Sequence, residues 1–351
     1  MEVITREIKT EYFSNPILDE YFEGRSFCTY DIETLGLDPR RAPVILAGMM
    51  CVSPDGTAQV KQFFLEEPEE EHILLDRIIE ELNKYDYIVT FNGHRFDIPY
   101  IEKRYKMIYH CLPDIRPFDL DLYLVIKGHS GLKETLPSLR QKCIEEYMGL
   151  ASERDDEISG GESVQLYYEY LLCEDPDLRE KIKQTILLHN YDDVVQLYRL
   201  LPIIRQCDLH SASFKLGFPV YERPDGEGMI LNVNSIKLTR NGLKITGKYT
   251  GDVFTYKSFS DMEQIWEAEF DRDRSFSVTC PVSARSKALF INLLDFFAET
   301  DDFRDYRGFV NNYLILKDEN ELYCRDINYF VKRLLEKLLW MTPGYSTKNR
   351  F

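Results

Sequence analysis

The segment that decides the fold spans residues 26–37 and reads SFCTYDIETLGL. Its apolar first half predicts a β-strand over residues 26–32, because β-branched and aromatic residues are frequent there. Asp31 and Glu33 stand two residues apart at the end of this strand. Successive side chains of a strand point to opposite faces, so these two carboxylates project to the same side of the sheet. The segment therefore predicts two oxygen ligands that converge at a sheet edge.

The pattern around this segment predicts a mixed sheet with helices on its faces. Residues 1–25 are a polar lead. Apolar strands are expected at Val44–Val52 and Ala58–Leu65, which would form an antiparallel meander with the first strand. Helical spacing over Pro68–Tyr85 and a short strand at Tyr87–Phe91 follow, and the rest of this half is expected to be mostly helical. Three strands, a helix, another strand and then helices are typical of an α/β fold.

The second half of the chain differs from the first in its charge balance and its pattern of apolar residues, which predicts a second domain. Residues 1–207 hold 23 Lys and Arg against 39 Asp and Glu, a net charge of −16, whereas residues 208–351 hold 20 against 21. We therefore expect a boundary near residue 208 and a smaller C-terminal α+β domain. Its expected strands are Met229–Leu238, Leu243–Tyr249, Phe276–Val282, Tyr313–Leu316 and Leu322–Arg325, and its expected helices are Ser286–Phe297 and Asp326–Trp340.

Composition and charge narrow the classes of function. The 351 residues have a net charge of −17 and no apolar run near the roughly 20 residues that a membrane-spanning helix needs. The eight cysteines stand singly, at least 23 residues apart, which is typical of a reducing compartment, so we expect a cytoplasmic protein. The acidic first half argues against sequence-independent binding of duplexes, but it allows a nucleic-acid enzyme whose carboxylates hold metal ions. The absence of Gly-rich phosphate loops and of a Gly-x-Ser-x-Gly motif argues against ATP-driven, nicotinamide and serine-hydrolase chemistry.

Further acidic residues occupy sequence positions from which their side chains can reach the same sheet edge. Asp97 begins a helix just after the Asn92-Gly93 turn that follows a strand. His189 and Asp193 are four residues apart on a long helix, so they share one face. Four carboxylates at one sheet edge would repel one another unless divalent cations neutralised them, and such oxygens are the ligands that Mg²⁺ and Mn²⁺ prefer. The pattern predicts a two-metal site for phosphodiester chemistry, with His189 as the base that takes a proton from water.

Each of these elements also has a plainer interpretation. An Asp-x-Glu pair at a strand end is usually a solvated turn, and a His/Asp pair at this helical spacing is usually a surface interaction. Asn92 and His94 are candidate substrate contacts, although a hydrogen-bonded loop would also use them. We interpret Asp119-Leu120-Asp121 as a helix start. The prediction of a metal site rests on the occurrence of all these elements together and in this order.

This order of motifs resembles the ribonuclease H-like superfamily and, within it, the DEDD group of 3′–5′ exonucleases. The sequence is more closely similar to the YprB-type ribonuclease H-like family, over about residues 25–205. The segments that carry the resemblance are Tyr30–Leu37, Val89–Pro99, Asp119–Leu122, Arg154–Gly161 and His189–Val194. The resemblance implies that Asp31 and Glu33 form the first motif, Asp97 the second and Asp193 the third, all as metal ligands.

One departure from the better-studied members concerns the base. In the DEDDh exonucleases a His precedes the last Asp by five residues, and in the DEDDy group a Tyr precedes it by four. Here His189 stands at the four-residue spacing, so the metal ligands are better defined than the base. Tyr191 and Asp192 lie nearby, and the resemblance puts the ligand at Asp193 rather than at Asp192.

These observations predict a metal-dependent 3′–5′ exonuclease that acts on single-stranded DNA or RNA with two Mg²⁺ or Mn²⁺ ions. The expected architecture is a ribonuclease H-like mixed β-sheet flanked by helices over residues 1–207, and an α+β domain of unknown role over residues 208–351. The alternative is a non-catalytic module that binds nucleic acid or a protein, because the first domain is acidic and its base departs from known members. In the second domain, basic candidates for substrate contact are Lys237, Arg240, Lys244 and Lys248, although such residues on strands usually form only a solvent face.

Overall fold

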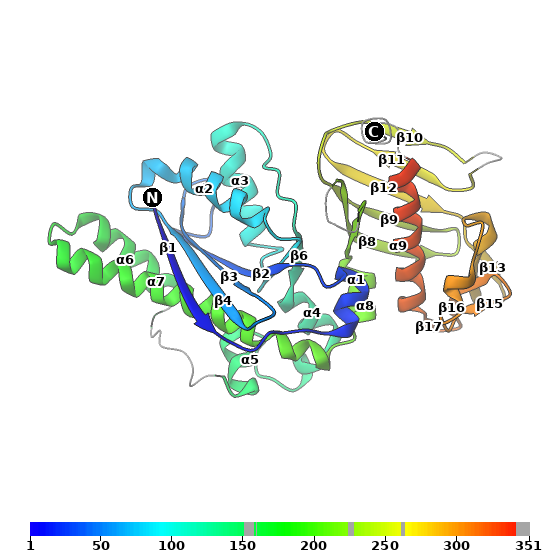
Figure 1. The fold of residues 1–351 in the computed structure, drawn as a ribbon, viewed down its shortest axis with the longest axis horizontal. Helices are drawn as coiled ribbons and strands as arrows, with labels where there is room; N and C mark the ends of the chain where they lie inside the picture. The colour runs from blue at the N-terminus through cyan, green and yellow to red at the C-terminus, as the bar shows by residue number, and fades with distance from the viewer. Residues whose placement is uncertain (151–157, 159, 224–227, 261–263, 342–351) are drawn as a thin grey trace. The chain divides into compact units, whose positions relative to one another are not determined.

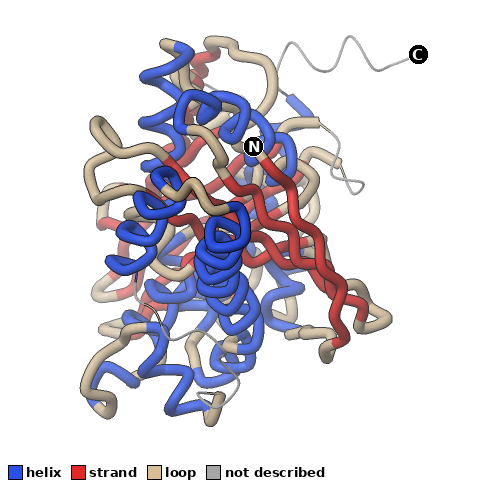
Figure 2. The backbone as a smooth tube through the Cα atoms, turned by 90° about the vertical axis from the view of Figure 1, so that its left-hand side faces the viewer, coloured by secondary structure: helices blue, strands red, loops and turns tan. Residues whose placement is uncertain are grey.

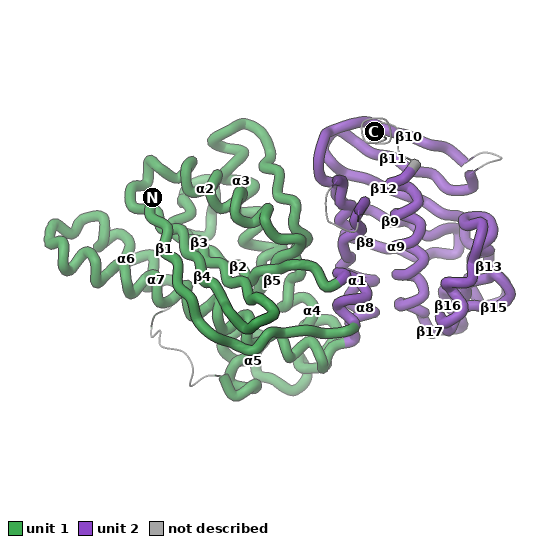
Figure 3. The backbone as a smooth tube through the Cα atoms, in the orientation of Figure 1, with its two compact units in different colours: residues 1–16, 24–207 green, residues 17–23, 208–351 purple. Residues whose placement is uncertain are grey.

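A computed structural model of the protein describes residues 1–150, 158, 160–223, 228–260 and 264–341. The chain divides into two compact units (Figure 3). The first consists of Met1–Pro16 and Gly24–Cys207, and the second of Ile17–Glu23 and Asp208–Phe351. A short segment near the N-terminus therefore belongs to the second unit rather than to the first.

A six-stranded mixed sheet forms the centre of the first unit (Figure 1). In spatial order its strands are β1 (Glu2–Lys9), β4 (Thr57–Phe64), β3 (Val44–Val52), β2 (Phe27–Thr34), β5 (Tyr87–Thr90) and β6 (Phe118–Asp121). The pairs β1–β4, β4–β3 and β3–β2 are antiparallel, whereas β2–β5 and β5–β6 are parallel. Strand β2 thus lies inside the sheet, between an antiparallel and a parallel neighbour. The mixed sheet and its antiparallel meander confirm the predicted fold class.

Helices cover both faces of this sheet (Figures 1 and 2). They are α2 (Glu71–Leu82), α3 (Asp97–Tyr109), α4 (Leu122–His129), α5 (Gln141–Met148), α6 (Gly160–Leu172) and α7 (Pro176–Arg199). On β4, Lys61 forms an ion pair with Glu81 of α2, and Gln62 donates a hydrogen bond to Asn190 of α7. Because consecutive strand residues point to opposite faces, α2 and α7 lie on opposite sides of the sheet. Apolar side chains from the strands, α2, α6 and α7 form the core between them.

The sequence patterns miss two strands of this sheet. Residues 2–9 belong to the expected polar lead, but they form the edge strand β1, whose side chains alternate between half-buried and exposed. With no fully buried position, this strand has only a weak apolar signal. The interpretation of Asp119-Leu120-Asp121 as a helix start is also wrong, because these residues end the four-residue strand β6. Helix α4 begins at the next residue, with the Asp121 carboxylate accepting a hydrogen bond from Leu124 N at 3.2 Å.

The second unit contains two antiparallel sheets and three α-helices within the described ranges. The order of the larger sheet is β10 (Tyr256–Ser258), β11 (Glu267–Phe270), β12 (Ser275–Cys280), β9 (Gly242–Tyr249), β8 (Ile230–Thr239) and β7 (Pro219–Tyr221). The smaller sheet contains β13 (Ser283–Arg285), β14 (Ala288–Asn292), β16 (Tyr313–Asp318) and β15 (Phe309–Val310), with β17 (Glu321–Leu322) beside β16. The helices are α1 (Pro16–Phe22), α8 (Leu209–Leu216) and α9 (Cys324–Met341). Asn328 of α9 joins the other two by donating to Tyr21 Oη at 3.0 Å and to the His210 carbonyl at 2.9 Å.

Two expectations for the second unit are corrected by the structure. The helix expected at Ser286–Phe297 does not form; strand β14 and the 3₁₀ turn Leu293–Asp295 occupy most of it. A short apolar run does not separate helix from strand by itself, and here burial alternates as in a strand. The strand expected at Leu322–Arg325 ends at once, because α9 begins at Cys324. In the described part of the chain, no helix is both long and apolar enough to cross a membrane.

A buried ion pair ties α2 to the sheet and to α3. Glu71, the first residue of α2, accepts hydrogen bonds from Val44 N at 3.0 Å and from Arg104 Nε at 2.8 Å. Both charged side chains are largely buried. The pair therefore fixes the helical layer that lies on the side of the sheet opposite α7.

We predict that Glu71→Ala lowers the free energy of unfolding by about 3 kcal/mol, because it leaves the Arg104 guanidinium buried without its carboxylate. Urea denaturation followed by circular dichroism measures this loss. Glu80→Ala is the control on the same helix, since it removes an exposed pair with Arg77 and should cost less than about 1 kcal/mol. Equal losses in the two variants would contradict the structural role of Glu71.

Candidate metal centre

Strand β2 supplies two carboxylates to one end of the sheet. Asp31 lies opposite Gly48 of β3, and Glu33 follows two residues later on the same face. Tyr30 and Ile32 point to the other face, where they are buried in the core. This burial fixes the register of the strand, since a shift by one residue would exchange the two faces.

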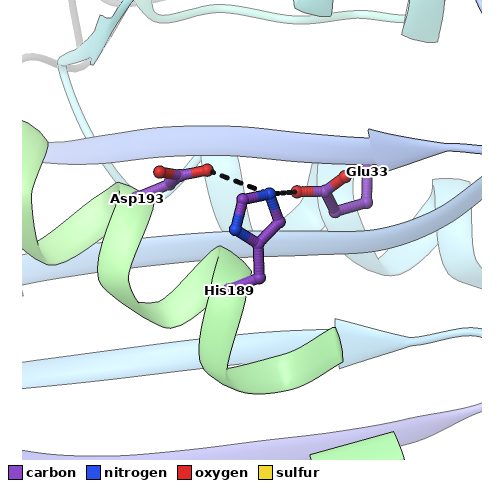
Figure 4. Close-up of side chains that lie close together, drawn as sticks. All are labelled: Glu33, His189 and Asp193. Atoms are coloured by element: carbon purple, nitrogen blue, oxygen red, sulfur yellow. Dashed lines mark ion pairs between the residues drawn. The ribbon is translucent and has the colours of Figure 1, made fainter. Parts of the chain in front are cut away.

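Helix α7 brings a histidine and a third carboxylate to the same place (Figure 4). His189 Nε2 lies 3.5 Å from Glu33 Oε1 and 3.7 Å from Asp193 Oδ2. Each of the three residues offers one ligand atom, and these atoms lie within 4.8 Å of one another. Carboxylate oxygens and imidazole nitrogens are ligands of divalent cations, so this three-residue group can hold a metal ion. The sequence predicted His189 as the base and did not include it among the ligands.

Asp31 is held beside this group by a chain of two side-chain amides. Asn190 Nδ2 donates to Asp31 Oδ2 at 3.1 Å, and Gln62 Nε2 donates to Asn190 Oδ1 at 3.1 Å. Gly48 makes room for this arrangement, because a Cβ atom at residue 48 would lie 2.1 Å from Asn190 Oδ1. Sequence reasoning missed Asn190, Gln62 and Gly48, and the only local signal was that Asn190 adjoins His189.

Asp97 reaches the same end of β2 from helix α3. It is the first residue of that helix, and its buried Oδ1 accepts a hydrogen bond from the backbone N–H of Ile32 at 3.2 Å. Ile32 lies between Asp31 and Glu33 in the sequence, so Asp97 lies beside the strand end that carries them. Asp97 does not belong to the three-residue group within 4.8 Å.

The charges of these carboxylates act on one another. Burial raises the pKa of Asp31 well above its usual range, and the charges of Asp97, Asp193 and Glu33 raise it further. Burial likewise raises the pKa of Asp97 to about 7, with a smaller contribution from Asp121. A divalent cation among these oxygens would offset both burial and mutual repulsion. The residues present therefore fit a metal ion.

The loop between β5 and α3 is fixed by Asp121. Its Oδ1 accepts a hydrogen bond from Asn92 N at 2.9 Å, and its Oδ2 accepts one from His94 N at 3.2 Å. Asn92 has a φ of 68°, a left-handed conformation that Asn tolerates. The ring of His94 is exposed, and its Nδ1 lies 3.9 Å from Asp119 Oδ2. Asn92 and His94 thus take part in a hydrogen-bonded loop, and Asp121 is a further residue whose role the sequence did not reveal.

The remaining motif residues are placed as follows. Tyr191 packs its ring against the Arg6 guanidinium, 5.1 Å from the ring centroid. Asp192 is buried, and it is Asp193 that lies near His189. Of the motif segment Arg154–Gly161, residues 154–157 and 159 lie outside the described residues, and the two glycines at its end begin α6.

Comparison with known sequences gives a family match and one partial relative. A family model for the RNase_H superfamily matches residues 28–204. Among curated proteins, a DNA polymerase from Methanocaldococcus jannaschii is 33% identical over 85 residues, which are 22% of this chain and 5% of the polymerase. The chain therefore spans only a small part of that relative.

Similar solved structures include a polymerase and a protein of bacterial origin. The family B DNA polymerase from the hyperthermophilic archaeon Pyrobaculum calidifontis aligns over 56% of this chain and 25% of its own, with 21% identity and a TM-score of 0.40. Brucella melitensis NrnC aligns over 58% of this chain and 82% of its own, with 19% identity and a TM-score of 0.33. The family model matches half of the chain and spans the residues from Asp31 to Asp193. On the strength of that match, the chain belongs to the RNase_H superfamily.

Proposed function

We propose that this protein is a metal-dependent 3′–5′ exonuclease that hydrolyses the phosphodiester bonds of single-stranded nucleic acid. The observation that carries the proposal is the three-residue group Glu33, His189 and Asp193 at one end of the sheet. Asp31 and Asp97 lie at the same strand end, and the chain is a member of the RNase_H superfamily. Within that superfamily, the order of its motifs is similar to that of the YprB-type family and the DEDD exonucleases.

Two Mg²⁺ or Mn²⁺ ions are the proposed cofactors. Asp31, Glu33, Asp97 and Asp193 would hold these ions. Such a pair of ions, when bound, activates the attacking water and stabilises the leaving 3′ oxygen. The chain's own contribution is to hold these oxygens in place: the Asn190 amide holds Asp31, and the Ile32 N–H holds Asp97.

His189 is the proposed proton acceptor, and in this role its Nε2 is not a metal ligand, because the lone pair that would bind a metal ion is the one that takes the proton. Its Nε2 is directed at the carboxylates of Glu33 and Asp193 (Figure 4), so a proton at this nitrogen lies among the proposed ligands. The imidazole is almost fully buried, with 6% of its side chain exposed, which fixes its orientation.

The two halves of the chain have separate proposed roles. Residues 1–207 would form the exonuclease domain, and residues 208–351 a domain that contacts substrate or a partner. The hydrogen-bonded loop with Asn92 and His94 is a proposed substrate contact, because the His94 ring is exposed and the loop leads into helix α3, whose first residue is Asp97. A cytoplasmic setting would supply both DNA and RNA as candidate substrates.

We predict that Asp31→Asn slows cleavage of end-labelled single-stranded DNA or RNA by at least about 1,000-fold, because a metal ligand supports several kcal/mol of transition-state stabilisation. The wild-type protein with Mg²⁺ or Mn²⁺ should give a ladder that shortens from the 3′ end on a sequencing gel. Asp38→Asn, at an exposed carboxylate, is the matched control and should keep the wild-type rate.

Three results would count against this assignment in different ways. Wild-type cleavage by Asp31→Asn would remove Asp31 from the site. Shortening from the 5′ end would reverse the proposed polarity. No cleavage of either polymer by folded wild-type protein would favour the non-catalytic binding module.

We predict that Mn²⁺ raises the Tm of the wild-type protein, because only the folded chain gathers the ligands. At a concentration 100 times the Kd, the stabilisation would be about 2.7 kcal/mol. Asp193→Asn should reduce this shift, whereas Asp177→Asn, at an exposed position of the same helix, should leave it unchanged. A wild-type Tm that does not respond to Mn²⁺ would be inconsistent with a metal centre.

We predict that Asn190→Ala weakens Mn²⁺ binding by about 10- to 100-fold, because residues that hydrogen-bond to ligands orient them. Isothermal titration calorimetry measures the affinity, and the Mn²⁺ concentration for half-maximal cleavage gives a second readout. Gln184→Ala, at an exposed position of α7, is the control. If Asn190→Ala lowers the Tm but leaves the Mn²⁺ affinity unchanged, Asn190 has only a packing role.

A further inference from the structure

The larger sheet of the second unit has an exposed face that carries three lysines. Lys237 on β8 lies directly opposite Lys244 on β9. Lys248 follows four residues later on β9, so it points to the same face. All three are exposed, whereas Ile245, which points to the other face, is fully buried. We call the surface formed by Lys237, Lys244, Lys248 and the hydroxyl residues between them the lysine face.

Hydroxyl side chains occupy most of the positions around these lysines, and the buried Asn232 of β8 lies opposite Lys248. Thr246 lies between the two lysines of β9, opposite Ser235 of β8 on one side and Ser277 of β12 on the other. The remaining neighbours on β12 are Thr279, opposite Lys244, and Ser275, opposite Lys248. Ammonium and hydroxyl groups are among the donors that proteins use for phosphate oxygens. The lysine face is therefore an array of phosphate donors on three adjacent strands.

The placement of the lysines carries a cost in the free protein. Like charges directly opposite in an antiparallel pair destabilise it, and Lys237 and Lys244 form such a pair. Among the described strand residues, the carboxylates that the register places on this face lie two strands from β9. Glu267 and Glu269 are on β11, and Glu269 pairs with Lys257 of β10 at 3.0 Å. An anion bound along β8 and β9 would offset the repulsion between the lysines.

Lys248 also interacts with a carboxylate at the end of this face. Asp273, in the turn before β12, interacts with Lys248, and its carboxylate also accepts hydrogen bonds from Ser275. The hydrogen bonds to Ser275 hold Asp273 at the end of the face. The lysine pair of β8 and β9 lies toward the opposite end of β9. A bound anion would therefore be attracted most strongly to Lys237 and Lys244.

We propose that the lysine face binds the sugar–phosphate backbone of single-stranded nucleic acid. The proposal rests on the proposed function, because that polymer is the proposed substrate. Its charge suits this face and not the first half of the chain, where residues 1–207 have a net charge of −16. Lys244 and Lys248 lie about 13 Å apart along the strand, at about 3.3 Å per residue, so they would contact separate phosphates with Thr246 between them. Contacts of this kind are independent of base sequence.

The test is a binding measurement that does not depend on cleavage. In an Asp31→Asn background, fluorescence anisotropy follows the binding of labelled oligothymidylate and oligouridylate of about 20 nucleotides, longer than common site sizes. The test variant combines Lys237→Gln, Lys244→Gln and Lys248→Gln. The matched control combines Lys215→Gln, Lys287→Gln and Arg304→Gln, which remove the same charge from exposed positions of the same unit.

The expected result is a change in both affinity and salt dependence. Each lost phosphate contact on a single strand lowers the slope of log K against log salt by about 0.7, so three contacts lower it by about 2. We expect the test variant to bind at least about tenfold more weakly at low salt, and the control to keep the wild-type slope. The Tm of the test variant should be at or above that of the parent protein, because the repulsion between Lys237 and Lys244 is removed.

The possible outcomes separate this proposal from the nuclease proposal. Equal slopes and affinities for the two triple variants would overturn the lysine face as a nucleic-acid surface and leave an acidic protein as its partner. The same conclusion follows if the parent protein binds neither oligonucleotide. If the test variant loses binding but the wild-type protein cleaves nothing, the lysine face stands and the exonuclease proposal fails.

Discussion

The close approach of helix α7 to the central strands is the contact on which the candidate site depends. Residue 48 has no side chain, so Asn190 can lie directly against β3 and bond to Asp31 and Gln62. His189 immediately precedes Asn190 on the helix, and its position beside Glu33 follows once the helix is seated. A side chain at residue 48 would push the helix away from the sheet. The carboxylates of β2 and the imidazole of α7 would then no longer share one place.

The elements that could be predicted from the sequence are those with a strong burial pattern. Strands β2, β3 and β4 are buried over most of their length, and they form close to where the pattern predicts them. Strand β1 at the sheet edge has no buried position, and β6 is too short for its apolar residues to outweigh its two aspartates. The helix predicted in the region of β14 was wrong for another reason, because the apolar run there fits the helical and the strand period alike. Burial in the folded chain, which the local sequence does not contain, decides such cases.

The candidate site divides in the same way between local and long-range information. Strand alternation is enough to place Asp31 and Glu33 on one face, and helical spacing is enough to pair His189 with Asp193. The amide chain from Gln62 through Asn190 depends on contacts between different elements, and nothing near residue 190 reveals that residue 48 is a glycine in contact with it. Asp121 is a similar case, because its hydrogen bonds to the β5–α3 loop join segments that are distant in the sequence. Spacing rules therefore identify candidate ligands better than the residues that orient them.

A metal-dependent nuclease must meet two opposite electrostatic demands. Its ligands concentrate negative charge in a buried place, and at the proposed site burial raises the pKa of Asp31, with the charges of its neighbours raising it further. Its substrate is itself a polyanion, which such a region repels wherever cations do not neutralise it. Lysines placed among the carboxylates would form ion pairs with them. The carboxylates would then bind metal ions less well, and the lysines would no longer be available to phosphates. In the proposed role of the lysine face, positive charge on a separate sheet, where Lys237 lies directly opposite Lys244, would keep the donors available to phosphates. On this argument, the near-neutral balance of the second half complements the acidity of the first and is not merely different from it.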